Sequence, residues 1–183
     1  ALAQPMGLAL AGDALLVADA ESSAVREVDL TARGSVRTIV GTGLFDFGHV
    51  DGVGEKARLQ HPQGLAVAED GRVLVCDSYN DARRWLDLTA REVSTWVRGL
   101  HEPGGIAIGA RSVYVADTNA HRVAVIDIGA TEVRPLVIVE EYQLCARSGA
   151  ALPRAEVLLA MRAVPHSHAR RGTPRERLRH RER

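Results

Sequence analysis

The chain contains three copies of one sequence pattern, and this repetition constrains its fold more than any single motif does. Each copy begins with a proline and reaches an aspartate 14 or 15 residues later, at the end of a short apolar run. A glycine stands two positions after each proline, and a second aspartate follows the first by ten residues. The landmarks are Pro5, Gly7, Asp19 and Asp29 in the first copy, Pro62, Gly64, Asp77 and Asp87 in the second, and Pro103, Gly105, Asp117 and Asp127 in the third.

Each copy has the composition of a set of short β-strands. The segment after the proline and the two runs that end in aspartates are rich in Val, Ile and Leu, and turn-forming residues separate them. A further strand-like run follows each second aspartate, at 36–40, 93–97 and 133–139. Four strands in a unit of about 40 residues are typical of one blade of a β-propeller. The sequence therefore predicts an all-β fold with about three blades.

The second and third copies carry motifs that resemble NHL repeats. The stretches "PQGLAV" to "VLVCDSYND" and "PGGIAI" to "VYVADTNAHRVAVID" are similar to the family pattern of Pro-x-Gly-Ile-Ala, Tyr-Val-Ala-Asp and Asn-His-Arg. The stretch "FDFGHVDGVG", followed by "ARLQHPQGLA", resembles the family that couples a thioredoxin-like domain to an NHL propeller. The resemblance implies a ring of six blades, of which this chain holds an incomplete part. It also implies a thiol-disulfide role for the longer protein, although this chain has no CxxC motif.

The first copy is extended by a glycine-rich segment that begins at residue 41. This segment is not a phosphate-binding P-loop, because no lysine follows its glycines at the required position. Its acidic residues also lack the alternation of a calcium-binding loop. The residues that we take as candidates for contact with a ligand or a partner are Asp46, His49 and Asp51.

Three expectations concern packing. We expect the apolar side chains of Leu44, Phe45 and Phe47 to cover part of the core, and residues 55–62 to form a short helical turn that leads into the second copy. In the tandem pair Arg83-Arg84, strand alternation predicts one outward-facing side chain and one structural or interblade side chain.

The polar residues of the repeats allow two interpretations. The first aspartate of each copy could line a central channel as a metal or substrate ligand, or it could accept backbone N–H groups in the turn that leaves its strand. Recurrence in every copy favours the structural role, and the second aspartates fit strand-end turns. In the third copy Asn119, His121 and Arg122 match the family motif and are candidates for a ligand face, although a solvated loop is the preferred interpretation.

The net charge of zero conceals two oppositely charged regions. Residues 1–145 carry 13 basic and 20 acidic side chains, whereas residues 146–183 carry 10 and 3. We therefore separate a propeller segment, residues 1–145, from a basic tail, residues 146–183, with a short helix near 154–164. For the tail, disorder is favoured over a nucleic-acid-binding arm, because no aromatic residues accompany its arginines.

The sequence predicts a non-catalytic binding or scaffold segment that presents loops and a shallow face to a protein partner or a small ligand. The alternative is a propeller hydrolase or a metal-dependent lyase, similar to lactonases, with a site in the central channel. The open edges of an incomplete ring also predict self-association. We expect no catalytic residues, no metal and no cofactor. Nucleic acid is not a favoured partner, and the lack of a run of about 18 apolar residues argues against a membrane span.

Overall fold

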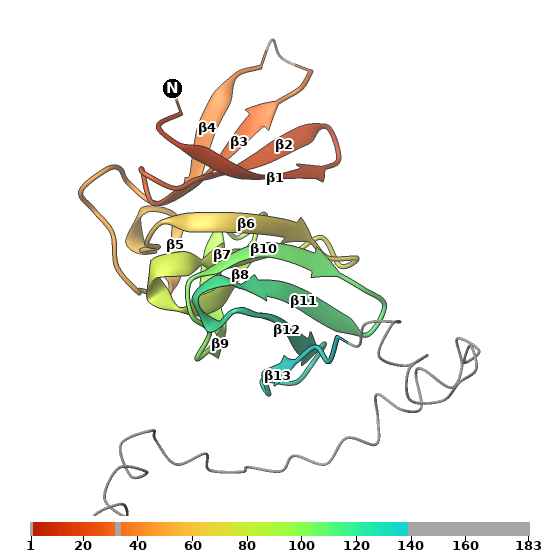
Figure 1. The fold of residues 1–183 in the computed structure, drawn as a ribbon. Coiled ribbons are helices and arrows are strands. Elements are labelled where there is room, and N and C mark those ends of the chain that lie inside the picture. The colour runs from red at the N-terminus through yellow and green to blue at the C-terminus, as the bar shows by residue number, and fades with distance from the viewer. Residues whose placement is uncertain (1, 32–33, 139–183) are drawn as a thin grey trace, which may run out of the picture. The chain divides into compact units, whose positions relative to one another are not determined.

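The computed structural model describes residues 2–31 and 34–138, and it folds them into three antiparallel sheets (Figure 1). Blade 1 consists of β1 (Pro5–Ala11), β2 (Ala14–Asp19), β3 (Ala24–Asp29) and β4 (Val36–Val40). Blade 2 consists of β6 (Pro62–Val67), β7 (Val73–Asp77), β8 (Ala82–Asp87) and β9 (Glu92–Arg98). Blade 3 consists of β10 (Pro103–Ile108), β11 (Ser112–Asp117), β12 (Arg122–Asp127) and β13 (Arg134–Pro135). The predicted all-β, blade-like organisation is confirmed.

Within each blade the strands follow one another in chain order, and each pairs with its neighbour. The first strand of every blade has a register irregularity just after its proline. The fourth strand of blade 3 is shorter than expected, because only Arg134–Pro135 pair with β12 and a proline cannot donate a ladder hydrogen bond. No helix in the described part of the chain is long and apolar enough to cross a membrane. The predicted basic tail and its helix lie outside the described residues.

The repeated glycine lets the first strands of neighbouring blades approach closely. The strands β1, β6 and β10 lie side by side (Figure 1). A Cβ atom built at Gly7 would lie 2.1 Å from the carbonyl oxygen of Gln63, and one at Gly64 would lie 2.1 Å from that of Gly104. Any side chain at Gly7 or Gly64 would therefore force the two strands apart.

Two apolar cores lie between the blades. In the first, Leu16 and Ala18 of blade 1 pack with Leu65 of blade 2. In the second, Leu74 of blade 2 packs with Val115 of blade 3. Because side chains alternate between the faces of a strand, blade 2 has both faces covered, whereas blades 1 and 3 each have one face covered.

The linker, defined as residues 41–61, packs against blade 2 through its second half. Strand β5 (Gly52–Val53) pairs with the outer edge of β9, and a single 3-10 turn, η1 (Gly54–Lys56), follows. This turn is the part of the expected helical segment that forms.

Buried residues of the linker were not those expected from the sequence. Ala57 and Leu59 are fully buried in the first core, whereas Leu44, Phe45 and Phe47 are exposed. The expectation that these three side chains cover the core is therefore wrong. The backbone pairing of Val50 with Arg58 folds residues after the tip onto blade 2, and the tip, residues 44–47, lies outside this hairpin.

Candidate functional site

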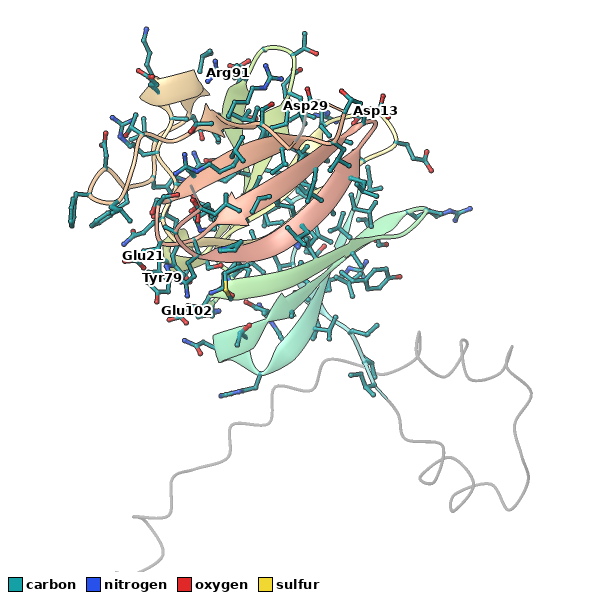
Figure 2. The ribbon with its side chains drawn as sticks, turned by 90° about the horizontal axis from the view of Figure 1, so that it is seen from above. Asp13, Glu21, Asp29, Tyr79, Arg91 and Glu102 are labelled. Atoms are coloured by element: carbon teal, nitrogen blue, oxygen red, sulfur yellow. The ribbon has the colours of Figure 1, made fainter. Side chains whose placement is uncertain are left out.

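The second strand of each blade ends at the same end of the propeller segment, and the loops there form a candidate surface. We call it the loop face and define it by residues 20–23, 78–81 and 118–121, together with the chain that enters each blade. Figure 2 shows Glu21, Tyr79 and Glu102 at this end of the strands, and Asp13 and Asp29 at the opposite end.

The aspartate that ends each second strand holds the chain that enters its own blade. All three carboxylates are fully buried, and each accepts a hydrogen bond from a backbone N–H located one or two residues before the repeat proline. The pairs are Gln4 with Asp19 at 2.7 Å, Gln60 with Asp77 at 2.7 Å and His101 with Asp117 at 2.6 Å. The donors thus lie before the first strand, and not in the turn after the second strand as we had expected.

An arginine pairs with the same aspartate in each blade, which sequence reasoning missed. In the first two copies this arginine stands seven residues after the aspartate, and in the third it stands five residues after it, so a search for recurrent Asp–Arg spacing would have found two of the three. The pairs are Arg26 with Asp19 at 3.0 Å, Arg84 with Asp77 at 2.6 Å and Arg122 with Asp117 at 2.7 Å. The arrangement fixes the loop face by charge-assisted hydrogen bonds.

Asp19 and Asp77 occupy equivalent positions of the repeat, but their pKa values are shifted in opposite directions. Burial acts to raise the pKa of Asp19, but hydrogen bonds, the largest from Ser22, outweigh it and hold this pKa below its usual value. More protein surrounds Asp77 than Asp19, and this deeper burial raises the pKa of Asp77 to about 6, although the Gln60 backbone N–H, the Asn80 side chain and Arg84 favour its charged form. Asp77 lies under the linker, whose residue Gly48 accepts a hydrogen bond from Asn80, and this cover explains the difference.

Both tandem arginines of β8 are fully buried, so the expectation that one faces solvent is wrong. The two side chains do point to opposite faces of the strand, but blade 2 is covered on both of them. Arg84 pairs with Asp77 and Asp51. The guanidinium nitrogens of Arg83 have no hydrogen-bond partner among the described residues, and the group lies 5.8 Å from the ring centre of Trp96. Burial lowers the pKa of Arg83 to about 10.

The linker candidates His49 and Asp51 come together beside blade 2. The Asp51 carboxylate accepts hydrogen bonds from Arg84 at 2.6 Å and from the backbone N–H and hydroxyl of Thr95 at 3.0 and 2.9 Å. Partial burial acts to raise the pKa of Asp51, but these bonds outweigh it and lower the pKa. The Nε2 atom of His49 lies 3.0 Å from the Thr95 hydroxyl, and burial, together with Arg84 and Arg98, lowers the pKa of His49. These groups tie the linker to β9.

Asp46 stands apart from this pair, at the exposed tip of the linker. Its carboxylate accepts hydrogen bonds from Thr42 and Arg58, and the Thr42 hydroxyl, followed by Arg58, lowers the pKa of Asp46. The structure therefore does not unite Asp46, His49 and Asp51 into one constellation.

The candidates of the third copy shape a turn after β11. The 3-10 turn η3 (Thr118–Ala120) ends at His121, which has a left-handed backbone with φ of 52° and donates its N–H to the Thr118 carbonyl. In blade 2 the turn η2 (Ser78–Asn80) ends in the same way at Asp81, also with φ of 52°. The Asn119 side chain is exposed, and its backbone N–H donates to His101. Arg122 is engaged with Asp117 as described above.

A shallow hollow of about 190 Å³, lined by both polar and apolar residues, lies beside the linker tip. Leu44 and Phe47 form one wall, and His61 and Tyr79 form another, with their rings stacked 4.4 Å apart. Glu21 of blade 1 also lines it. Sequence reasoning missed His61 and Tyr79, which belong to separate segments and carry no shared motif.

A larger cavity of about 470 Å³ lies between blades 2 and 3, at the end opposite the loop face. Trp85, Leu74 and Val113 give it an apolar wall. The Arg72 guanidinium lies 4.2 Å above the Trp85 ring and pairs with Asp70 at its rim. No group of three or more His, Cys, Asp or Glu side chains placed to hold a metal ion occurs in residues 2–31 and 34–138.

Comparison with known sequences and structures relates the chain to propellers. The family model described as "NHL repeat" matches residues 59–81 and 100–126. NHL repeat-containing protein 2 of Bos taurus is 40% identical over 153 residues, which cover 69% of this chain and 21% of that protein. Protein SUPPRESSOR OF QUENCHING 1, chloroplastic, of Arabidopsis thaliana is 37% identical over 161 residues, which cover 75% of this chain and 15% of that protein. The chain thus spans about a fifth or less of the length of these relatives.

Solved structures with the same fold are more distant in sequence. A chain of a nidogen/laminin complex matches with a TM-score of 0.57 at 19% identity, over 73% of this chain and 48% of that one. A streptogramin B lyase structure matches with a TM-score of 0.55 at 11% identity, over 74% and 41%. At these identities the likeness concerns the fold alone.

Proposed function

Because the chain belongs to the NHL-repeat β-propeller family, we propose that it is a non-catalytic binding segment that contacts a protein partner through the loop face. The tip of the linker, residues 44–47, borders the loop face, because it shares a hollow with Glu21 and Tyr79, and it is the centre of this contact. Loops that a rigid sheet scaffold positions are where propellers and other β-folds carry their binding residues.

The observation that carries this proposal is the exposure of the linker tip. The Phe45 side chain is 93% exposed, and Leu44 and Phe47 line the hollow beside it. Exposed aromatic side chains next to a partly apolar hollow mark protein interaction sites, because their burial against a partner removes apolar surface from water. The stacked His61 and Tyr79 rings give the hollow a firm wall.

The test compares the tip with an equally apolar position elsewhere. Proteins bound by the chain are identified by proximity labelling, and the affinity of each purified partner is then measured by titration calorimetry. We expect the double variant Phe45→Ser and Phe47→Ser to lose about tenfold or more in affinity. The control variant Leu30→Ser replaces an exposed leucine beside Asp29, at the opposite end of blade 1, and should bind as the wild type does. Equal affinity of the double variant and the wild type would refute the proposal.

We further propose that a longer protein containing this chain has a thiol-disulfide role, as the resemblance to thioredoxin-like/NHL proteins implies. Within this chain Cys76 is a fully buried thiol whose pKa burial raises to about 12, which makes it a poor nucleophile. The second cysteine, Cys145, lies outside the described residues. Because the chain has no CxxC motif, we propose that a CxxC-bearing domain of the longer protein performs the thiol-disulfide chemistry, with this chain as its binding segment. Sequencing the neighbouring coding regions tests this assignment, because a CxxC motif in a thioredoxin-like domain should occur there.

The enzyme alternative places a metal or substrate site in the central channel. Asp19, Asp77 and Asp117 are the residues best suited to it by type, but each carboxylate is held by an arginine and a backbone N–H. Recruiting them for a metal would break these ion pairs, which is why the binding function is preferred. A thermal shift with calcium or zinc that chelator reverses would favour the enzyme.

A further inference from the structure

The stacked rings beside the linker tip distinguish blade 2 from blade 3. Tyr79 stands two residues after the repeat aspartate of blade 2, and His61 directly precedes its proline, whereas blade 3 has Asn119 and Glu102 at these positions. The backbone is nevertheless the same, because Tyr79 and Asn119 each donate an N–H to the carbonyl two residues before the proline, at 3.1 and 3.0 Å. Since blade 3 makes this turn without rings, the blade fold does not require the stack of His61 on Tyr79.

The hollow that these rings border has room for one long side chain. Its volume is about 190 Å³, whereas pockets for small-molecule ligands are roughly 300–1,000 Å³. Tyr79 and Phe47, from two different walls, are each about half exposed. The hollow therefore offers aromatic surface to a single inserted side chain, and it is too small for a whole small-molecule ligand.

The charge around the hollow is negative. Glu21 lines it and is exposed, and within residues 2–31 and 34–138 no hydrogen bond or ion pair engages its carboxylate. The residues that line the hollow include no arginine and no lysine. The loop face adds the exposed carboxylates of Asp81 and Glu102, and its basic residues are histidines (Figure 2). This distribution of charge favours a cationic side chain in the hollow.

Blade 2 holds one of its own arginines with the same kinds of group. The Arg72 guanidinium lies 4.2 Å above the centre of the Trp85 ring and pairs with Asp70 at 2.7 Å. A guanidinium is planar and weakly hydrated, so it stacks on an aromatic ring and pairs with a carboxylate at the same time, better than the compact ammonium of lysine does. Tyr79 and Glu21 present a ring and a carboxylate to the hollow in the same way.

We propose that the hollow receives one arginine side chain of the protein partner, with its guanidinium stacked on the Tyr79 ring and paired with Glu21. This inference rests on the proposed function and deepens it: the linker tip makes the apolar part of the contact, and the arginine is its charged anchor. Arginine is one of the residues that most often dominate the binding energy of an interface. The partner is therefore a protein whose contact segment carries an exposed arginine.

Titration of the full chain with short peptides, followed by nuclear magnetic resonance, tests the arginine directly. The peptides are acetylated and amidated and carry arginine, lysine or citrulline between flanking glycines; citrulline has the shape of arginine without its charge. We expect the arginine peptide to bind about tenfold more tightly than the citrulline peptide and about threefold more tightly than the lysine peptide. Equal binding of the arginine and citrulline peptides, or a preference for lysine, would overturn the proposal.

Variants of the hollow locate the peptide. Tyr79→Leu keeps an apolar side chain but removes the ring, and it should weaken the arginine peptide by about tenfold. Glu21→Gln removes the carboxylate charge and should weaken it by about threefold. Tyr79→Phe keeps the ring, and Asp13→Asn removes a charge at the opposite end of blade 1 (Figure 2), so both should bind as the wild type does. Circular dichroism should be unchanged in all four variants, because the substituted side chains are exposed.

The arginine site and the proposed function fail in different ways. If the double variant Phe45→Ser and Phe47→Ser loses its partner while Tyr79→Leu and Glu21→Gln keep full affinity, the binding function stands and the arginine site is wrong. If the peptides discriminate as expected but no partner depends on the tip, the arginine site stands and the contact through the tip is wrong. Peptide affinity that neither Tyr79→Leu nor Glu21→Gln changes would overturn the arginine site by itself.

Discussion

Blade 1 and blade 2 share the same repeat positions, yet their environments differ because blade 2 lies between two blades and under the linker. Leu65 is buried where Leu8 is exposed. Arg84 is fully buried between Asp77 and Asp51, whereas Arg26 reaches its partner Asp19 with 21% of its side chain exposed. The repeat sequence therefore specifies the backbone conformation and the strand pairing of each blade. The segments that pack on a blade determine how much its equivalent side chains and ion pairs contribute to the free energy of unfolding.

The comparison also separates two roles of charge. In both blades the aspartate holds the entering chain through a backbone N–H. In blade 2 the ion pair is also desolvated, and the removal of one partner leaves the other charge buried. Variants made at equivalent positions of the two blades test this separation directly.

The first difference between the blades should appear at the repeat aspartates. Asp77→Ala leaves the buried Arg84 with Asp51 as its remaining carboxylate partner, and we expect a loss of about 3 kcal/mol in the free energy of unfolding. Asp19→Ala leaves Arg26 near water, and the expected loss is about 1 kcal/mol. Urea unfolding of the dilute chain at neutral pH measures both. Equal losses for the two variants would show that burial by neighbouring segments does not determine how much the Asp–Arg ion pair contributes to the free energy of unfolding.

The next difference concerns the equivalent leucines. Leu65→Ala removes a buried side chain from the first core, and such cavities cost about 2–4 kcal/mol. Leu8→Ala trims an exposed side chain, and we expect a change within about 0.5 kcal/mol. The measurement is chemical unfolding at concentrations where the chain is monomeric. A large loss for Leu8→Ala under these conditions would mean that the Leu8 side chain is covered within one folded chain.

Opposite pH dependence should distinguish the two aspartates. Burial raises the pKa of Asp77 to about 6, above its unfolded value of about 3.9, so the folded chain holds this proton more tightly. The stabilisation that this tighter proton binding adds is full below about pH 4 and is lost as the pH rises through about 6, whereas the ion pair with Arg84 remains at neutral pH. The pKa of Asp19 is lowered, so its contribution is present above about pH 4 and is lost as the pH falls.

The measurement is the free energy of unfolding of the wild type minus that of Asp77→Asn or Asp19→Asn, from about pH 3 to 7. The Asp77 difference should fall with rising pH, by an amount on the order of 3 kcal/mol, and the Asp19 difference should rise. If both differences changed with pH in the same direction, the linker would not be the cause of the raised pKa of Asp77.

The sequence predicts the fold well because the blade is a local unit. Recurrent spacing from Pro62 to Asp77 and Asp87 marks strands that pair with their neighbours in the chain, so no long-range information is needed. The site depends instead on contacts between distant segments, such as Asp51 with Thr95, Arg84 with Asp51, and His61 with Tyr79. The spacing of residues in the sequence does not reveal these contacts. The alternation of side chains along a strand also failed to predict the burial of Arg83, because both faces of blade 2 are covered.

The last comparison concerns the linker, whose two halves differ in the same way as the two blades. Its second half contributes Leu59 to the first core, and Leu59→Ala should cost about 2–4 kcal/mol. Phe45→Ala removes a larger side chain, but that side chain is exposed at the tip, so the free energy of unfolding should change by less than about 0.5 kcal/mol. Thermal or urea unfolding of both variants shows whether the Phe45 side chain covers the core or is available to contact a partner. A loss near that of Leu59→Ala would restore the sequence-based expectation that the tip covers the core, whereas an unchanged stability leaves the Phe45 ring free to serve a partner.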